Sequence, residues 1–306
     1  MASGLANLQG QKRVEPLKRS PRSWLWLRVA VISCLICYLY WNVLFHMALD
    51  WWQQPDLSQG MLLPPLALFV AWAERRYILS QPASRDGRGL ILLAFACFML
   101  AFGQLASEFF SKRFSFVLVI AGLIWAFWGI RRLRAVSFPL LLLAVMVPLP
   151  TLVYNMIAEP LQLLASSVAT HFAQALGVSV YQAGNVIQLA HISLGVAEAC
   201  SGLNSLSALI VGSLILGYLV CNRKLSRILL VILSVPLAVG VNVVRVAGTA
   251  VLADYNQEFA MGFYHMFSGW LVFVAGTIAL YFVALAIHAL LDRPKAAVMN
   301  AKAEAV

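Results

Sequence analysis

Long apolar runs constrain this chain more than any other feature. Eight runs approach or reach the roughly 17 to 25 residues that an α-helix needs to cross about 30 Å of hydrocarbon. They lie at residues 24–46, 60–79, 89–107, 114–130, 136–150, 201–221, 228–252 and 266–290. A content of 62% hydrophobic and 11% charged residues is typical of membrane proteins, not of soluble domains. The sequence therefore predicts an all-α, polytopic transmembrane helical bundle of about eight spans.

The net charge of +10 is distributed in a way that argues against a nucleic-acid partner. If the spans alternate in direction, all but three of the 22 Lys and Arg residues fall on one side of the bilayer. The positive-inside rule assigns that side to the cytoplasm, together with both termini. The basic excess then sets the orientation and contacts anionic lipid headgroups. The three exceptions are Lys112 and Arg113, expected as interfacial anchors in a short outer turn, and Arg245 inside an apolar run.

The spans divide the chain into one large domain and two tails. Residues 1–22 are polar and basic, which predicts a disordered cytoplasmic tail. Residues 23–292 form the predicted transmembrane domain, and residues 293–306 form a second cytoplasmic tail. The first apolar run is too long for the core of a signal peptide and no small-residue cleavage site follows it, so we expect a retained anchor.

The stretch 151–199 interrupts the pattern of spans, and the predicted topology places it outside the cytoplasm. Polar residues recur in its first half at steps of three or four, which predicts an amphipathic helix. Such a helix lies in the outer interface or packs on the bundle with its polar stripe toward a cavity. β-Branched residues alternate around Gly184-Asn185 in the second half, which predicts a small hairpin before the sixth span. The polar stripe consists of Glu159, Gln162, Ser166, Thr170 and Gln174.

One of the five cysteines has polar neighbours at the start of a predicted span. Cys34 and Cys37 form a C-x-x-C inside the first apolar run without further ligands, which favours a packing role. Cys200 precedes the sixth span, where free backbone N–H groups and the helix dipole favour a thiolate. The alternative is a helix-start thiol with no role, and Glu198 either caps the helix or raises the thiol pKa. Ser201 is a less favoured nucleophile, of the kind that intramembrane serine proteases use, because the adjacent thiol is more nucleophilic.

Two further ionisable residues are predicted at the same depth as Cys200. Arg245 lies about 25 Å along a helix that begins near Ile228, which places it just below the outer surface. A charged residue there either snorkels outward or faces a partner or a wet cavity, and Asn242 one turn earlier can orient it. His265 opens the eighth span on the same side. Alone it is an ordinary interfacial histidine, but three spans that bring a thiol, a guanidinium and an imidazole together favour one site.

The three side chains suit a metal-free acyl transfer. Histidine takes the thiol proton and returns it to a leaving amine, while arginine stabilises the thiolate or a tetrahedral oxyanion. His171 and His191 are also expected on the outer side and remain possible bases.

Three sequence blocks carry a family resemblance. VAEACSGLNSL (196–206), NVVRV (242–246) and the H-x-x-x-G that begins at His265 resemble the signatures of the exosortase and archaeosortase family. MVPLP (146–150) also matches its pattern, as does the Gly184-Asn185 turn.

The resemblance implies a multi-span cysteine transpeptidase whose catalytic residues are Cys200, Arg245 and His265. Supporting positions in the same blocks are Glu198, Ser201, Asn204 and Asn242. The loop after the first span reads Ser58-Gln59-Gly60, where the family often has Ser-His-Gly. This departure puts a role for a loop histidine in doubt and leaves the other three residues untouched.

The resemblance also implies a substrate class and a location. The expected partners are exported proteins that end in a short Pro-Glu-Pro-type motif, a hydrophobic helix and a basic tail, commonly linked to exopolysaccharide production. Processing is expected at the periplasmic face of the bacterial inner membrane, without a cofactor or metal. One alternative is a membrane cysteine endopeptidase that uses water. A transporter or scaffold is disfavoured, because transporters carry polar groups at the midplane and here the ionisable groups gather at the outer mouth.

Overall fold

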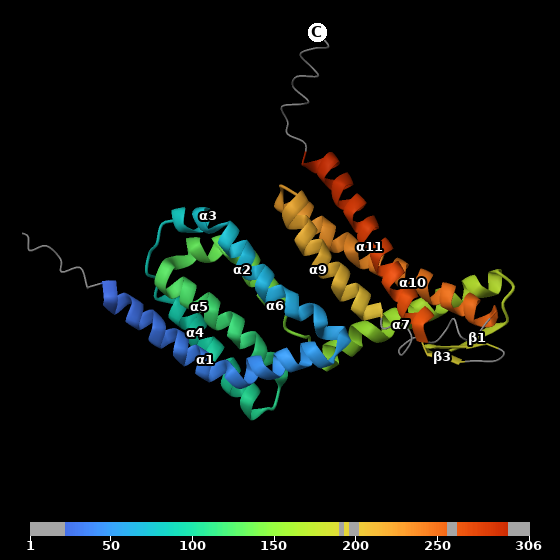
Figure 1. Cartoon of the computed structure of the whole chain (residues 1–306), viewed down its shortest axis with the longest axis horizontal. Coiled ribbons are helices and arrows are strands. Elements are labelled where there is room, and N and C mark those ends of the chain that lie inside the picture. The colour runs from blue at the N-terminus through green and yellow to red at the C-terminus, as the bar shows by residue number, and fades with distance from the viewer. Residues whose placement is uncertain (1–21, 190–192, 196–201, 256–261, 293–306) are drawn as a thin grey trace, which may run out of the picture. The chain divides into compact units, whose positions relative to one another are not determined.

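The computed structural model describes residues 22–189, 193–195, 202–255 and 262–292. Residues 1–21 and the segment 293–306, where the tails are predicted, lie outside the described residues. The chain divides after Ala48 into two units, the first containing most of α1 and the second containing everything else (Figure 1). The first elements are α1 (Arg22–Gln53), η1 (Pro55–Leu62), α2 (Leu63–Ala73), α3 (Arg75–Ser80), α4 (Arg88–Leu105), α5 (Phe109–Ala135) and α6 (Ser137–Val145). They are followed by α7 (Thr151–Ala175), β1 (Val180–Ala183), β2 (Val186–Leu189), β3 (Ser193–Gly195), α9 (Gly202–Val220), α10 (Lys224–Tyr255) and α11 (Gly262–Leu291).

Helices long and apolar enough to cross a membrane dominate the described residues. Five qualify by length and composition, and Leu57–Ala73 and Leu206–Val220 are shorter apolar helices. Large apolar side chains remain exposed on them, for example Leu105 at 89% and Leu290 at 81%. Such surfaces suit a lipid environment, so the chain is a helical transmembrane protein, and eight spans remains a prediction. The five helices are Ala30–Gln53, Arg88–Leu105, Phe109–Ala135, Lys224–Asp254 and Gly269–Leu291.

Two of the predicted spans are interrupted for visible reasons. The run 60–79 begins in η1 and is divided at Glu74, where the backbone leaves helical geometry between α2 and α3. The run 136–150 contains only the nine-residue helix α6. Pro148 and Pro150 follow it, and a proline disfavours the helical conformation of the residue before it. The length of an apolar run does not by itself predict either break.

Glycines set the close packing of α4 on α5. A Cβ on Gly89 of α4 would lie 2.3 Å from the backbone nitrogen of Ala126 on α5, so only glycine permits this approach. Near its end α5 is kinked at Gly129, which has a φ of +85°. A Cβ there would lie 2.6 Å from the carbonyl oxygen of Ser84. The predicted run 114–130 therefore ends at a real change of direction.

The turn between α4 and α5 buries a charge. Glu108 caps α5 by accepting hydrogen bonds from the backbone N–H groups of Phe110 at 2.8 Å and Ser111 at 2.6 Å. Arg113 in the first turns of α5 is only 7% exposed and forms an ion pair with Asp50 at the end of α1. The arginine expected as an interfacial anchor is thus a buried partner of a carboxylate, because a buried charge requires compensation.

Contacts between distant segments join the basic regions at one end of the second unit, here called the basic end. The hydroxyl of Tyr218 on α9 donates to Glu74 at 2.6 Å, and the guanidinium of Arg227 stands 5.4 Å from the centre of the same tyrosine ring. Arg132 Nε donates to the carbonyl oxygen of Gln81 at 3.0 Å. Alternating spans require this clustering of the basic segments 75–88, 131–134 and 223–227.

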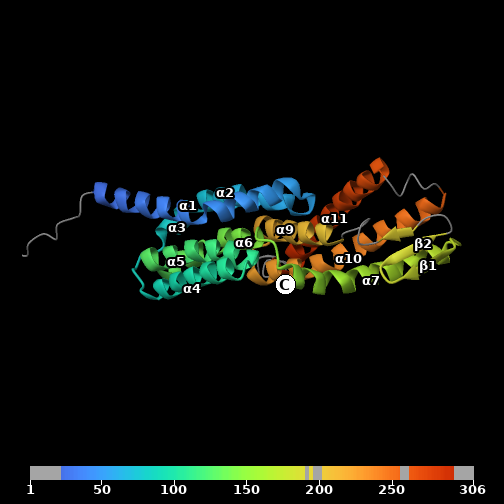
Figure 2. The ribbon, with the colours of Figure 1, turned by 90° about the horizontal axis from the view of Figure 1, so that it is seen from below.

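Helix α7 presents its small polar side to α10 and its large apolar side outward. Ser166 and Thr170 are buried, whereas Leu163 and Phe172 are exposed. Figures 1 and 2 both show α7 beside α10. Small side chains allow the two helices to approach closely. The shared core consists of Ala165, Ala169 and Ala173 of α7, Val246, Ala247, Ala250 and Ala253 of α10, and Val180 and Ile187 of the strands.

The segment after α7 forms the expected hairpin and one additional strand. β1 and β2 are antiparallel, with Ala183 opposite Val186 and a two-residue loop between them. Gly184 in this loop has a φ of +65°, a conformation that glycine adopts without strain. Gln174 Nε2 of α7 donates to the carbonyl oxygen of Val180 at 3.0 Å and ties the sheet to the helix. β3 pairs with β2 and completes a three-stranded sheet.

Candidate functional site

The directions of α9, α10 and α11 bring three predicted site segments to the same end of the bundle. α9 and α10 are antiparallel neighbours joined by the short turn 221–223. Asp292, directly after α11, accepts a hydrogen bond at 2.8 Å from the backbone N–H of Asn222 in that turn. At the basic end, the last residues of α9 and α11 therefore meet the first residues of α10. The opposite end of the second unit is here called the site end. It contains the first residues of α9 and α11 and the later part of α10.

One layer of contacts fixes the depth of these helices relative to one another. A Cβ on Gly276 of α11 would lie 3.3 Å from Leu209 Cδ1 of α9 and 3.3 Å from Val241 Cγ1 of α10. From this layer, Gly202 at the start of α9 is about 10 Å farther toward the site end, and Arg245 is about 6 Å farther along α10. The start of α9 and Arg245 of α10 therefore both lie on the site-end side of this layer.

Arg245 spans the gap between α10 and α11. Its side chain is half-buried, and its guanidinium lies against Gly269 of α11, where an added Cβ would be 3.0 Å from Nη2 and 3.2 Å from Cζ. His265 precedes Gly269 by four residues, which places both on the same face of α11, one turn apart. The structure thus brings the predicted arginine to the helix face that carries the predicted histidine.

The other predicted site residues are described to different extents. Glu198, Cys200 and Ser201 lie outside the described residues, directly before α9 begins at Gly202. The backbone of Asn204 lies in the first turn of α9 and that of His265 in the first turn of α11. The first four N–H groups of a helix lack intrahelical partners, so both first turns carry backbone donors that need acceptors from outside the helix.

Asn242 is buried one turn before Arg245, as the N-x-x-R spacing predicts. Only 7% of it is exposed, and it lines a cavity of about 20 Å³ between α7, α9 and α10. Its Oδ1 has no hydrogen-bond partner among the residues that the structure describes. Gln162, from the predicted polar stripe, lines the same cavity.

The alternative histidines are placed differently from His265. His171 lies on α7, exposed, with Nδ1 2.7 Å from the carbonyl oxygen of Ser167. His191 lies outside the described residues.

One contact near the site end was not predictable from sequence spacing. Gln59 Nε2 in η1 donates to Ser207 Oγ on α9 at 2.6 Å, although 148 positions separate the two residues. Ser207 lies less than two turns into α9. The only signal in the sequence was the Ser58-Gln59-Gly60 departure from the family pattern, and the structure shows that this loop contacts the helix that follows Cys200.

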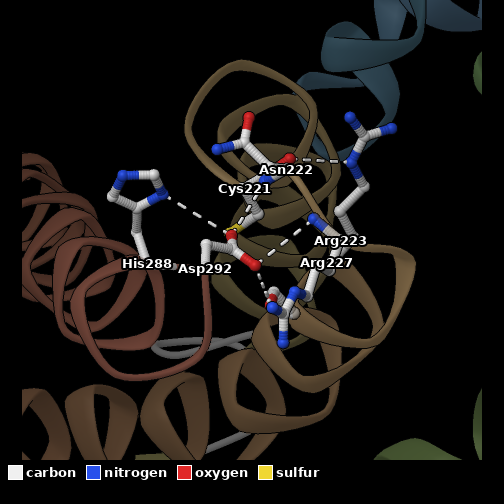
Figure 3. Close-up of polar contacts among 7 residues, drawn as sticks. Cys221, Asn222, Arg223, Arg227, His288 and Asp292 are labelled. Carbon is white, nitrogen blue, oxygen red and sulfur yellow. Dashed lines mark hydrogen bonds and ion pairs between the residues drawn. The ribbon is translucent and has the colours of Figure 1, made fainter. Parts of the chain in front are cut away.

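A second polar cluster lies at the basic end (Figure 3). The carboxylate of Asp292 accepts hydrogen bonds from the N–H groups of Asn222 at 2.8 Å and Arg223 at 3.3 Å and from Ser226 Oγ at 2.7 Å. His288 Nδ1 stands 3.5 Å from the same carboxylate. Asp292 therefore caps the start of α10 from the end of α11.

The charge of Asp292 is stabilised by these donors. Burial opposes its ionisation, but the hydrogen bonds from Ser226 and from the backbone of Asn222 outweigh burial and hold the pKa of Asp292 below its ordinary value. A carboxylate that caps a helix through two backbone N–H groups and a serine hydroxyl has a structural role. No group of three or more metal-binding side chains occurs within the described ranges, here or at the site end.

Comparison with known proteins identifies the family of this chain. The family model of the transmembrane exosortases matches residues 51–282, which run from the end of α1 well into α11. The match includes the positions of Cys200, Arg245 and His265. Searches of the curated proteins and of the solved structures found no match. Because the family model covers most of the sequence, the chain belongs to the transmembrane exosortase family.

Proposed function

We propose that this exosortase cleaves the C-terminal sorting signal of exported proteins through a thioester on Cys200 and transfers the product to an amine acceptor. Family membership indicates a membrane enzyme that processes sorting signals. The observation that carries the finer proposal is the guanidinium of Arg245 against Gly269, one turn from His265. A fixed cation beside the start of α11, with α9 beginning directly after the cysteine, is the environment that an acyl-transfer nucleophile requires.

The first half of the reaction breaks the peptide bond. His265 accepts the thiol proton, and the Cys200 thiolate attacks the substrate carbonyl. Arg245 stabilises the oxyanion of the tetrahedral intermediate. The intermediate collapses by expelling the amine, which takes the proton from His265, and the acyl group remains on Cys200 as a thioester.

The second half regenerates the enzyme. An acceptor amine loses a proton to His265 and attacks the thioester carbonyl. The carbon–sulfur bond breaks, the new amide leaves, and the Cys200 thiolate recovers its proton. With water in place of the amine, the same steps release a free carboxylate.

The substrates in this proposal are proteins with a Pro-Glu-Pro-type motif, a hydrophobic helix and a basic tail. The positive-inside rule supports placing the basic end in the cytoplasm and the site end at the periplasmic face of a bacterial inner membrane. The hydrophobic helix of the substrate then spans the bilayer beside the bundle, with its motif at the site end.

Co-expression with a tagged substrate tests the proposal. We expect wild-type protein to remove the hydrophobic tail and Cys200→Ala to leave it attached, whereas Leu219→Ala, a control at an exposed position of α9, retains processing. Mass spectrometry of the new C-terminus distinguishes transfer from hydrolysis. An added group supports transfer, and a free carboxylate shows an endopeptidase. Unchanged processing by Cys200→Ala refutes the cysteine mechanism.

A further inference from the structure

We propose that the site end contains a separate body that bends on the rest of the bundle and so moves Arg245 relative to α11. The hinge lies in two neighbouring helices, α7 and α10, at the level where two buried cores are separated. The movement itself does not rest on the proposed function, whereas its effect on catalysis does.

The buried core of these helices is divided into two clusters that share no residue. The site-end core is the one already described, formed by α7, α10 and the strands. In the part of the chain that the structure describes, α9 and α11 contribute no residue to it. The second cluster, here called the bundle core, joins all four helices. It consists of Ala158, Leu206, Leu209, Cys221, Leu230, Ala238, Leu280, Ala284 and Ile287.

The two cores are separated at one level of α7 and α10. On α7, Leu161 packs against the bundle core and Ala165 belongs to the site-end core. On α10, Ala238 belongs to the bundle core and Val243 packs against the site-end core. Both cores pair an earlier part of α7 with an earlier part of α10, so the helices run in the same direction. Residues 162–164 and 239–242 therefore lie side by side, and they are here called the hinge level.

Each of the two helices has a weak point at or just below the hinge level. Gly240 of α10 lies within it, and no atom of the described residues lies within 4 Å of a Cβ there, so close packing does not require this glycine. A glycine inside a helix lowers its stability and permits bending. Pro160 of α7 and Pro236 of α10 lie inside their helices within one turn below this level. Each proline removes a backbone hydrogen bond, so both helices bend most easily here.

Packing at the hinge level is incomplete. The cavity of about 20 Å³ lies there, since its lining runs from Ala158 to Gln162 on α7 and from Ala238 to Asn242 on α10. The buried Oδ1 of Asn242 has no hydrogen-bond partner among the described residues. A void and an unpaired polar atom both mean that fewer favourable contacts are lost when this level rearranges.

Arg245 connects the body above the hinge with the bundle below it. It follows the hinge level on α10, but its guanidinium lies against Gly269 of α11. The bundle core fixes α11 through Leu280 and Ala284. Arg245 is about 7.5 Å beyond Gly240 along the helix, so a kink of about 20° moves it by about 2.5 Å. Such a bend separates the guanidinium from the face of α11 that carries His265.

The bend gives the proposed reaction an open and a closed state. In the closed state, which the structure shows, Arg245 lies against α11. In the open state, the space between the two helices admits the substrate. Closure then returns the arginine to the position from which it stabilises the oxyanion.

Distances between paired spin labels test the hinge in the full-length protein in lipid nanodiscs. Genetically encoded amino acids carry the labels, so the native cysteines remain. One label replaces Leu252, exposed on α10 beyond the hinge level, and the other replaces Trp270, exposed on α11. Leu252 is about 18 Å beyond Gly240, so the same kink moves it by about 6 Å. We expect two populations whose mean distances differ by up to about 6 Å.

A control pair and two glycine variants locate the movement. Labels at Ile232 of α10 and Leu285 of α11, both exposed and below the hinge level, should give a single narrow distance. Gly240→Ala should reduce the bent population about fivefold, because alanine stabilises a helix relative to glycine. Gly248→Ala is the matched control. It lies on the same helix beside the site-end core, again with no described atom within 4 Å of a Cβ, and should leave both populations unchanged.

The outcomes separate this inference from the proposed function. A wild-type distance between positions 252 and 270 that is as narrow as that of the control pair shows that there is no hinge. An equal response to Gly240→Ala and Gly248→Ala shows that the bend does not lie at this level, and it also refutes the inference. If the wild type cleaves no substrate while its two populations respond only to Gly240→Ala, the proposed chemistry is wrong and the hinge stands.

Discussion

The guanidinium of Arg245 packs tightly against Gly269, because a Cβ at Gly269 would lie 3.0 Å from Nη2, closer than most Cβ contacts. The two residues belong to different helices, and His265 lies one turn from Gly269 on α11. The absence of a side chain at position 269 therefore allows the arginine to reach the histidine-bearing face of α11. This contact gives a physical reason for glycine at the last position of the H-x-x-x-G spacing.

Gly269→Ala should reduce substrate processing by about ten- to a hundredfold, because it displaces the guanidinium by a fraction of an ångström. The initial rate of tail removal at saturating substrate measures the effect. Gly248→Ala is the matched control, since no atom of the described residues lies within 4 Å of a Cβ there. It should keep full activity and gain up to about 1 kcal/mol of stability from the better helix propensity of alanine. Equal rates for the two variants contradict the positioning role of Gly269.

The contact of Gln59 with Ser207 should couple η1 to α9. Removal of either partner by alanine should lower the free energy of unfolding by about 1 kcal/mol, and the double variant should lose little more than either single one. Thermal unfolding of the four proteins in detergent measures this cycle. Strictly additive losses would show that the two side chains do not interact.

Asp292 should make the stability of the protein depend on pH in the acid range. Its folded pKa is lowered, so its contribution is complete above its unfolded pKa of about 4 and is lost as the pH falls through the folded pKa. Asp292→Asn should lower the free energy of unfolding at pH 7 by about 1 to 3 kcal/mol, because the donors that surround the buried carboxylate lose a charged acceptor.

Thermal unfolding between pH 3 and pH 7 measures this linkage. The wild type should lose stability below about pH 4, and Asp292→Asn should give a flatter profile. Ser226→Ala, which removes one donor of several, should fall between the two. Parallel profiles for the wild type and Asp292→Asn would assign the acid sensitivity to other groups.

Much of the architecture was predictable from apolar length and local pattern. The first, third, fourth, seventh and eighth apolar runs correspond to helices long enough to span a bilayer. The hairpin at Gly184-Asn185 followed from alternation and a turn signal, since a two-residue loop with positive φ requires such residues. These features depend on neighbours in sequence.

Features that depend on distant residues were not predictable. The ion pair of Arg113 with Asp50 and the contact of Gln59 with Ser207 join segments 63 and 148 positions apart. The position of Arg245 near α11 was predicted only as a depth, and the structure added the packing against Gly269. The burial of Asn242 beside a small cavity likewise depends on the packing of α7, α9 and α10.

The most direct test of the central claim is the intact mass of the protein after brief incubation with a substrate peptide and an acid quench. A thioester intermediate predicts an adduct equal to the mass of the substrate portion before the cleaved bond. The adduct should be absent from Cys200→Ala, should accumulate when no acceptor amine is present, and should be released by hydroxylamine. Substrate cleavage by the wild type with no such adduct at any quench time, or an adduct that persists in Cys200→Ala, would contradict the account.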